Sequence, residues 1–150
     1  MIRSATHGPI FDTSSVIGLV ERRSTALVDM TKELGRPLPR SITVYGELRH
    51  GASVADRPQR SDRERTLSRY ERLSEWSSSE VSLDDVGTAY GDVSALARDH
   101  DIALATNDRW IIAECVTQQA DLVTGDRRQA QLAELAAERL GAAFDVRVVD

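Results

Sequence analysis

Four acidic residues from distant segments of the chain have the residue type and the placement needed to hold a divalent cation. They are Asp12, Glu47, Asp108 and Asp126. Each follows a short apolar or strand-like segment and stands at or near the start of a predicted helix. In open α/β sheets, ligands bind outside the carboxyl ends of the strands. We therefore expect the four carboxylates to converge at one edge of a sheet.

Such a cluster would require a cation. Two carboxylates about 5 Å apart repel each other by about 3 kcal/mol at an effective dielectric constant of 20, and crowding raises their pKa values unless a cation neutralises them. Carboxylate and water ligands suit Mg²⁺, with Mn²⁺ as a substitute. Zinc fits less well, because Cys115 is the single cysteine and the three histidines show no ligand spacing. The predicted cofactor is therefore Mg²⁺.

The chemistry that this site favours is hydrolysis of a phosphodiester. A bound divalent ion lowers the pKa of water and stabilises charge that develops on a phosphoryl group. No Ser-His-Asp arrangement and no glycine-rich phosphate loop is apparent in the sequence. Taken one at a time, the acids have a simpler interpretation. Asp12, Asp108 and Asp126 each precede a helix, where aspartate commonly caps free amides, so the prediction depends on the combination.

Composition indicates one globular domain over residues 1–150. The chain has 41% hydrophobic and 29% charged residues, ordinary values for a globular protein. No apolar run approaches the ~20 residues of a membrane span, and the N-terminal residues lack a secretory pattern. Together with the single cysteine, this favours a cytoplasmic protein. The net charge of −5 disfavours a simple basic nucleic-acid binder, but clustered metal-binding acids would also lower the net charge.

Strand-like and helical patterns alternate along the chain. The predicted strands are 10–11, 41–43, 80–83, 121–124 and 146–149. The predicted helices are 14–22, 24–34, 44–52, 61–76, 84–100, 108–118 and 127–140, with Gly35 ending the second and Pro58 breaking the chain. Glu47 is expected in the first turn of its helix. This alternation predicts a mostly parallel sheet covered by helices on both faces.

Four short motifs, in this order, resemble those of the PIN-domain ribonucleases, and in particular the VapC toxins of VapBC toxin–antitoxin systems. They are Phe11-Asp12-Thr13-Ser14, Tyr45-Gly46-Glu47-Leu48, Asn107-Asp108-Arg109-Trp110-Ile111-Ile112-Ala113 and Leu122-Val123-Thr124-Gly125-Asp126. The resemblance covers nearly the whole chain. It implies a three-layer α/β/α sandwich with a central, mostly parallel sheet and a magnesium-dependent endoribonuclease. It also implies a homodimer and an antitoxin partner that blocks the active site.

The same resemblance assigns residues to roles. Asp12, Glu47, Asp108 and Asp126 become the acidic, metal-binding pocket. Thr13 and Thr124 become hydroxyl supports for that pocket or its waters, although such hydroxyls as often bond to the local backbone. Arginines beside the acids could bind phosphate; these are Arg109, Arg127 and Arg128.

The chain departs from the family at Glu114, where many relatives have a small residue. Glu114 could orient a basic residue near the pocket, but the simpler expectation places it on the solvent face of its helix. We expect Cys115 in the core. His7 could reach the pocket, but a mobile terminus is the simpler expectation.

Two other classes of function compete with the nuclease: a PIN-like module, and another magnesium-dependent α/β protein such as a phosphatase or a response-regulator receiver. A PIN-like module that binds RNA or protein without useful catalysis would be expected to have lost one of the four acids. A magnesium-dependent phosphatase of the haloacid type would need an Asp-x-Asp motif after the first strand, where this chain has Ser14. A response-regulator receiver would need an Asp pair and a late lysine, and neither is apparent.

Overall fold

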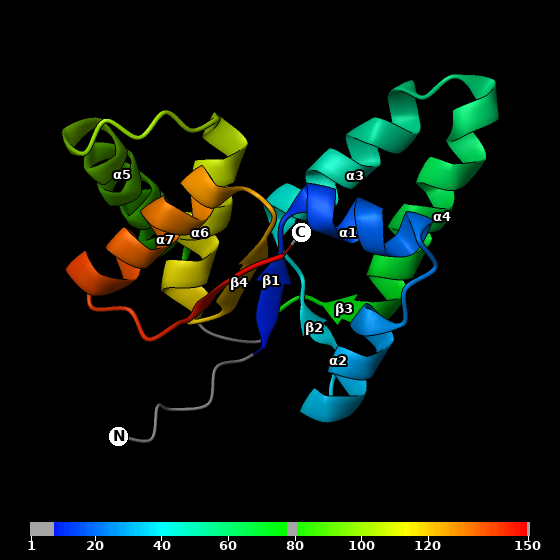
Figure 1. Ribbon diagram of the computed structural model, residues 1–150, viewed down its shortest axis with the longest axis horizontal. Helices are drawn as coiled ribbons and strands as arrows, with labels where there is room; N and C mark the ends of the chain where they lie inside the picture. The colour runs from blue at the N-terminus through cyan, green and yellow to red at the C-terminus, as the bar shows by residue number, and fades with distance from the viewer. Residues whose placement is uncertain (1–7, 78–80, 150) are drawn as a thin grey trace.

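The strands β1 (Pro9–Phe11), β4 (Asp121–Thr124) and β5 (Val146–Val148) form a parallel sheet in the order β1-β4-β5. This computed structural model describes residues 8–77 and 81–149. A second pair of parallel strands, β2 (Leu38–Pro39) and β3 (Ser74–Glu75), lies next to it in Figure 1. Every strand pairing in the described residues is parallel, as the sequence predicts.

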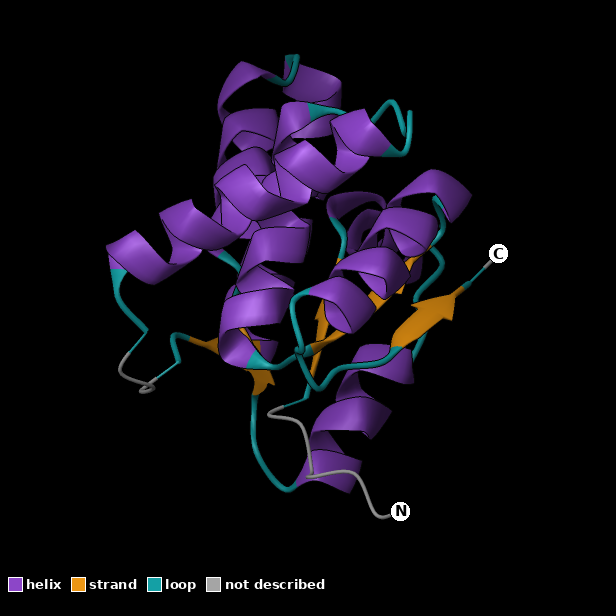
Figure 2. Ribbon diagram, turned by 90° about the vertical axis from the view of Figure 1, so that its left-hand side faces the viewer, coloured by secondary structure: helices purple, strands orange, loops and turns teal. Residues whose placement is uncertain are grey.

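Helices cover both faces of the sheet and complete the three-layer α/β/α sandwich. Their bounds are α1 (Thr13–Glu21), α2 (Ala26–Leu34), α3 (Ile42–Val54), α4 (Arg57–Leu73), α5 (Leu83–Asp99), α6 (Thr106–Gln118) and α7 (Arg127–Arg139). Figure 1 shows α5, α6 and α7 on one side of β1 and β4, and α1 to α4 on the other. Figure 2 is viewed from the side of α5, α6 and α7 and shows helices in front of the strands. The buried core includes Ile10 and Leu122 from the sheet and Ile111 and Leu132 from the helices.

Local signals in the sequence account for several helix ends. The Asp12 side chain caps α1. Gly35 ends α2 in the left-handed conformation, with φ of 66°, which glycine adopts without steric cost. A capping box of Ser82 and Asp85 begins α5. None of the described helices combines the length and the apolar character that crossing a lipid bilayer requires.

The strand predicted at 41–43 is wrong. The Ser41 side chain accepts a hydrogen bond from the Val44 amide, so Ser41 is the N-cap of α3, which begins at Ile42. A run of β-branched residues favours a strand by propensity, but the N-cap and burial of Val44 decide for a helix. The prediction for Pro58 is also wrong, because this proline lies in the first turn of α4, where its missing N–H costs nothing.

The strand predicted at 80–83 is wrong in its described part. Ser82 is the N-cap of α5 and Leu83 is its first residue, while residue 80 lies outside the described residues. The strand in this region is β3, at the end of the segment predicted as the helix 61–76. His7, which we considered as a pocket residue, also lies outside the described residues.

Candidate active site

Asp12 stands at the junction of the sheet and α1. Its backbone N–H donates to the Val123 carbonyl at 3.0 Å, which extends the β1–β4 pairing. One carboxylate oxygen, Oδ1, accepts from the Ser15 amide at 2.9 Å, and the other, Oδ2, accepts from the Thr124 hydroxyl at 2.6 Å. The side chain is only 6% exposed. The capping interpretation and the site interpretation are therefore both compatible with this aspartate, because each uses a different oxygen.

Thr124 connects two of the predicted site residues. Its fully buried hydroxyl, which donates to Asp12, also accepts from the Asp126 amide at 3.0 Å. The same oxygen lies 2.7 Å from Gln129 Oε1, and Gln129 Nε2 donates to the Asp108 carbonyl at 3.2 Å. Thr124 thus contacts a distant acid rather than the local backbone alone. Sequence reasoning missed Gln129, whose only signal is its position just after the Gly-Asp turn.

Replacing Thr124 with valine is expected to reduce RNA cleavage about 10- to 100-fold, the range seen when a residue that orients a metal ligand is lost. Valine keeps the shape but removes the hydroxyl that holds Asp12 and satisfies the Asp126 amide. Initial cleavage rates would measure the effect, and Thr124→Ser should recover most of the activity. Equal loss in the serine and valine variants would show that the hydroxyl is not the relevant group.

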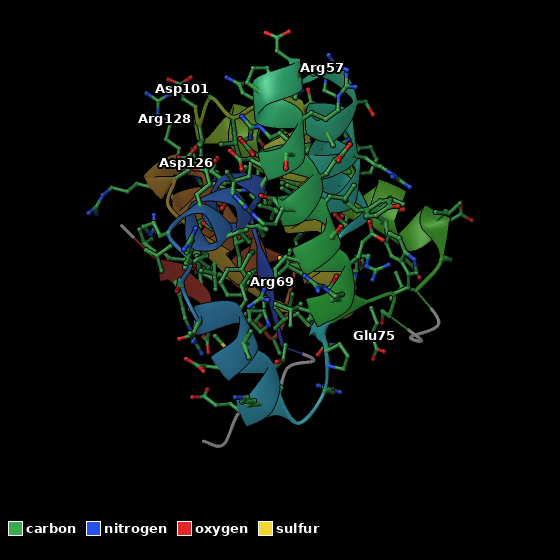
Figure 3. The ribbon with its side chains drawn as sticks, turned by 90° about the vertical axis from the view of Figure 1, so that its right-hand side faces the viewer. Arg57, Arg69, Glu75, Asp101, Asp126 and Arg128 are labelled. Atoms are coloured by element: carbon green, nitrogen blue, oxygen red, sulfur yellow. The ribbon has the colours of Figure 1, made fainter. Side chains whose placement is uncertain are left out.

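Asp126 caps α7 and faces the same cavity as Asp12. Its Oδ1 accepts hydrogen bonds from the Arg128 and Gln129 amides at 2.8 and 3.3 Å. In Figure 3, Asp126 and Arg128 lie on the α1 side of the molecule. Asp126 is exposed, so solvent and ligands can reach it.

Glu47 approaches from the opposite helical layer. Its Oε1 accepts a hydrogen bond from the Thr13 hydroxyl at 2.7 Å, which connects α3 to the first turn of α1. Because α3 begins at Ile42, Glu47 lies in the second turn and does not follow a strand, contrary to the prediction of a first-turn position. It lines a neighbouring pocket with Asn107 and Trp110.

The pKa of Asp108 is shifted by the charges of the other three acids of the predicted site. It lies in the first turn of α6. Burial, followed by the negative charges of Glu47, Asp126 and Asp12, raises the pKa of Asp108 from 3.8 to about 6. The four carboxylates from α1, α3, α6 and α7 are therefore close enough to interact electrostatically, as the sequence predicts.

The arrangement of the acids is open rather than closed. Asp12, Asp108 and Asp126 line one cavity of about 580 Å³. Among the described residues, no three acidic, histidine or cysteine side chains form a ready-made ligand set for a metal ion. Mg²⁺ commonly uses one or two carboxylates and keeps several waters, so a group of acids that repel each other around an accessible cavity fits this ion.

Raising the pH from about 4 to about 6 is expected to reduce the stability of the metal-free protein through Asp108. The raised pKa of about 6 means that the folded state binds this proton more tightly than the unfolded state does. The contribution is therefore fully present below about pH 4 and is lost as the pH rises through about 6. Urea unfolding in EDTA, compared between wild type and Asp108→Asn, would measure it. If the difference in the free energy of unfolding between wild type and variant stays constant over this pH range, the predicted contribution of Asp108 is wrong.

Glu114 is buried, which corrects the prediction of a solvent-facing side chain. It is 2% exposed, and its carboxylate accepts from the Ser41 hydroxyl at 2.7 Å and from the Ile42 amide at 2.8 Å. Burial raises the pKa of Glu114, while these hydrogen bonds oppose the shift. Glu114 thus fixes the N-terminus of α3, the helix that carries Glu47. Cys115 is fully buried, so its prediction as a core residue is confirmed.

Arg109 does not line the cavity that contains Asp12, Asp108 and Asp126. Its guanidinium donates to the hydroxyls of Ser94 and Thr106, each at 3.2 Å, and lies 5.4 Å from the centre of the Tyr90 ring. These contacts hold it against α5, which contradicts the suggestion that it binds phosphate beside the acids.

Several solved structures have the same fold, and the similarity covers nearly the whole chain. VapBC-1 from nontypeable Haemophilus influenzae gives a TM-score of 0.70 at 17% identity, covering 94% of this chain and 97% of that chain. VapBC2 from Rickettsia felis, bound to a promoter DNA fragment, gives a TM-score of 0.70 at 15% identity. This match covers 95% of this chain and 99% of that chain. VapBC-5 from Mycobacterium tuberculosis, of the VapBC family of toxin–antitoxin systems, gives a TM-score of 0.64 at 19% identity. This match covers 95% of this chain and 99% of that chain. At these identities the likeness establishes the fold.

The sequence itself supplies the family. No curated protein matches it. The family model of the PIN domain matches residues 10–135, a span that begins in β1, ends in α7 and contains all four acids. This match covers far more than half of the chain and agrees with the resemblance carried by the four motifs. The chain belongs to the PIN domain family.

Proposed function

We propose that this protein is a magnesium-dependent endoribonuclease, the toxin of a VapBC-type toxin–antitoxin pair. The observation that carries the proposal is that Asp12, Asp108 and Asp126 line one accessible cavity, with Glu47 near enough to help raise the pKa of Asp108. Membership of the PIN domain family supports a nuclease. The fold neighbours, whose structures are of VapBC systems, support the toxin assignment.

In the proposed mechanism, Asp12, Asp108 and Asp126 would hold Mg²⁺, and Glu47 would position the metal or a water. The ion, when bound, would activate water and stabilise the charge of the phosphoryl group. The chain's own residues prepare that site. The Thr124 hydroxyl fixes one oxygen of Asp12, and the Thr13 hydroxyl fixes one oxygen of Glu47. Asp108 must lose its proton to act as a ligand, so the affinity of the metal-free protein for Mg²⁺ should rise as the pH rises through about 6. Hydrolysis would break one P–O bond of the RNA backbone.

We also propose that the protein acts in the cytoplasm as a homodimer and that a cognate antitoxin controls it. The support for an antitoxin is that the fold neighbours are VapBC structures. Mn²⁺ should replace Mg²⁺ in activity assays, because both ions accept carboxylate and water ligands.

The deciding experiment is incubation of total cellular RNA with purified, antitoxin-free protein, in Mg²⁺ and in EDTA. Discrete fragments that require Mg²⁺ and disappear with Asp12→Asn would support the nuclease. Asn retains the oxygen that caps α1, so the variant should fold. Asp92→Asn, an exposed change in α5, is the control and should cleave normally. Absence of cleavage by folded protein across several RNA classes would favour the alternative, a catalytically weak PIN-like module that binds RNA or protein.

A further inference from the structure

The cavity that contains the acids also has a cationic part. Besides Asp12, Asp108 and Asp126, its lining includes the arginines Arg22 and Arg147. Its volume of about 580 Å³ lies within the ~300–1,000 Å³ typical of small-molecule and cofactor sites. One chamber thus combines negative groups suited to a metal with positive groups suited to an anion.

Arg22 reaches the cavity by lying back along α1. It is the C-cap residue of this helix, at the opposite end from Asp12. A Cβ added at Gly18 would lie 3.1 Å from Arg22 Nη1, so the guanidinium rests over the bare backbone of Gly18. Gly18 is about 9 Å from Asp12 along the helix axis, at ~1.5 Å per residue. The Arg22 charge is therefore placed about that far from the acid along α1.

Arg147 enters from the sheet. It pairs in register with Val123 of β4, which in turn pairs with Phe11 of β1. All three residues line the cavity. Two strand spacings of ~4.8 Å place Arg147 about 10 Å from Phe11, the residue that precedes Asp12. The two arginines thus approach the cavity from a helix and a strand.

Neither guanidinium is engaged by another of the described residues. Within residues 8–77 and 81–149, the side chains of Arg22 and Arg147 make no hydrogen bond and no ion pair. By contrast, Arg109 is held by two hydroxyls, and Arg40 donates to Ser74 and to the Glu71 carbonyl. A guanidinium presents a planar fork of donors that matches phosphate oxygens. Two unengaged forks facing one cavity are therefore available for an anionic ligand.

We propose that Arg22 and Arg147 bind backbone phosphates of the RNA next to the phosphodiester held at the acids. This inference rests on the proposed nuclease function and names how its substrate is held. Between the charged groups, the lining includes apolar side chains of Leu19, Met30 and Val149, against which a base can pack. The arginines would then fix the strand so that one phosphodiester lies at the carboxylates.

Binding of a fluorescein-labelled single-stranded RNA, followed by anisotropy, tests the proposal without cleavage. The background is Asp108→Asn in EDTA, which removes one repelling charge and any metal. The double variant Arg22→Ala/Arg147→Ala should weaken binding at least about 10-fold. It should also reduce the slope of log K against log salt by about 1.4, since each phosphate contact on a single strand contributes ~0.7. Both arginines are exposed, so the variants should fold, and circular dichroism would verify this.

Arg139→Ala is the matched control, because Arg139 is exposed in the last turn of α7, at the end remote from Asp126. It should leave both the affinity and the salt slope unchanged. An unaltered affinity and slope in the double variant, or equal losses in the control, would overturn the proposal. Arginine-dependent binding by a wild-type protein that never cleaves RNA would support this phosphate site while refuting the nuclease.

Discussion

Replacing Asp108 with asparagine is expected to abolish most RNA cleavage and, at the same time, to stabilise the metal-free protein. The loss of activity should reach at least about 100-fold, the upper end of what removing a mere supporting residue costs. The gain in stability follows from the raised pKa of Asp108, which shows that its negative charge is disfavoured by burial and by three other acids. Its side chain accepts no hydrogen bond from the described residues, so asparagine removes the charge without breaking a hydrogen bond to any of them.

Two measurements check this expectation. Initial cleavage rates in Mg²⁺ should fall, and the Tm in EDTA should rise, relative to wild type. Added Mg²⁺ should increase the Tm of wild type but hardly that of the variant, because binding to the folded state alone stabilises it. Asp92→Asn removes an acid outside the site and should change none of these quantities. A variant that is less stable than wild type in EDTA would contradict the account of repulsion among the acids.

Replacing Glu114 with alanine is expected to cost about 2–5 kcal/mol of the free energy of unfolding, because each buried donor left without its acceptor costs roughly 1–3 kcal/mol. The change leaves the Ser41 hydroxyl and the Ile42 amide without their acceptor and opens a cavity between α3 and α6. Glu114→Gln should cost less, because glutamine keeps one acceptor oxygen and nearly the same volume. Urea unfolding at neutral pH would measure both.

Glu134→Ala provides the comparison, since Glu134 is an exposed residue of α7 and such changes stay within about ±0.5 kcal/mol. A Glu114→Ala variant as stable as this control would mean that α3 does not depend on the buried carboxylate. Loss of cleavage in a stable Glu114→Gln variant would instead show that the displaced α3 no longer brings Glu47 to the site.

The parts of the site that could be predicted from sequence are those determined by local order. Asp12 and Asp126 follow apolar strands and cap helices, so their position at the sheet edge follows from two adjacent patterns. The boundaries of α5 and α7 were also predictable to within a residue or so, because their apolar periodicity is long. The start of α3 was not, since three β-branched residues there favour a strand and only the Ser41 cap indicates otherwise.

The remaining features depend on contacts between distant segments. The two-residue strands β2 and β3 exist because each is the other's partner, and such short strands have no periodicity to read. The burial of Glu114 depends on α3 packing beside α6, which no local pattern specifies. The contact of Thr124 with Asp12 follows from the β1–β4 register, which places Phe11 opposite Val123.

That register also constrains when the cavity can form during synthesis of the chain. The Thr124–Asp12 contact joins positions 112 residues apart, and ribosomes add roughly 5–20 residues per second. Asp12 is therefore synthesised at least several seconds before β4, Thr124 and Asp126. A nascent or prematurely released chain that stops before Asp121 lacks Thr124 and Asp126, and it has no β4 strand to pair with β1. The topology therefore ties formation of the cavity to the synthesis of β4, and a chain that stops before Asp121 cannot form the Thr124–Asp12 contact.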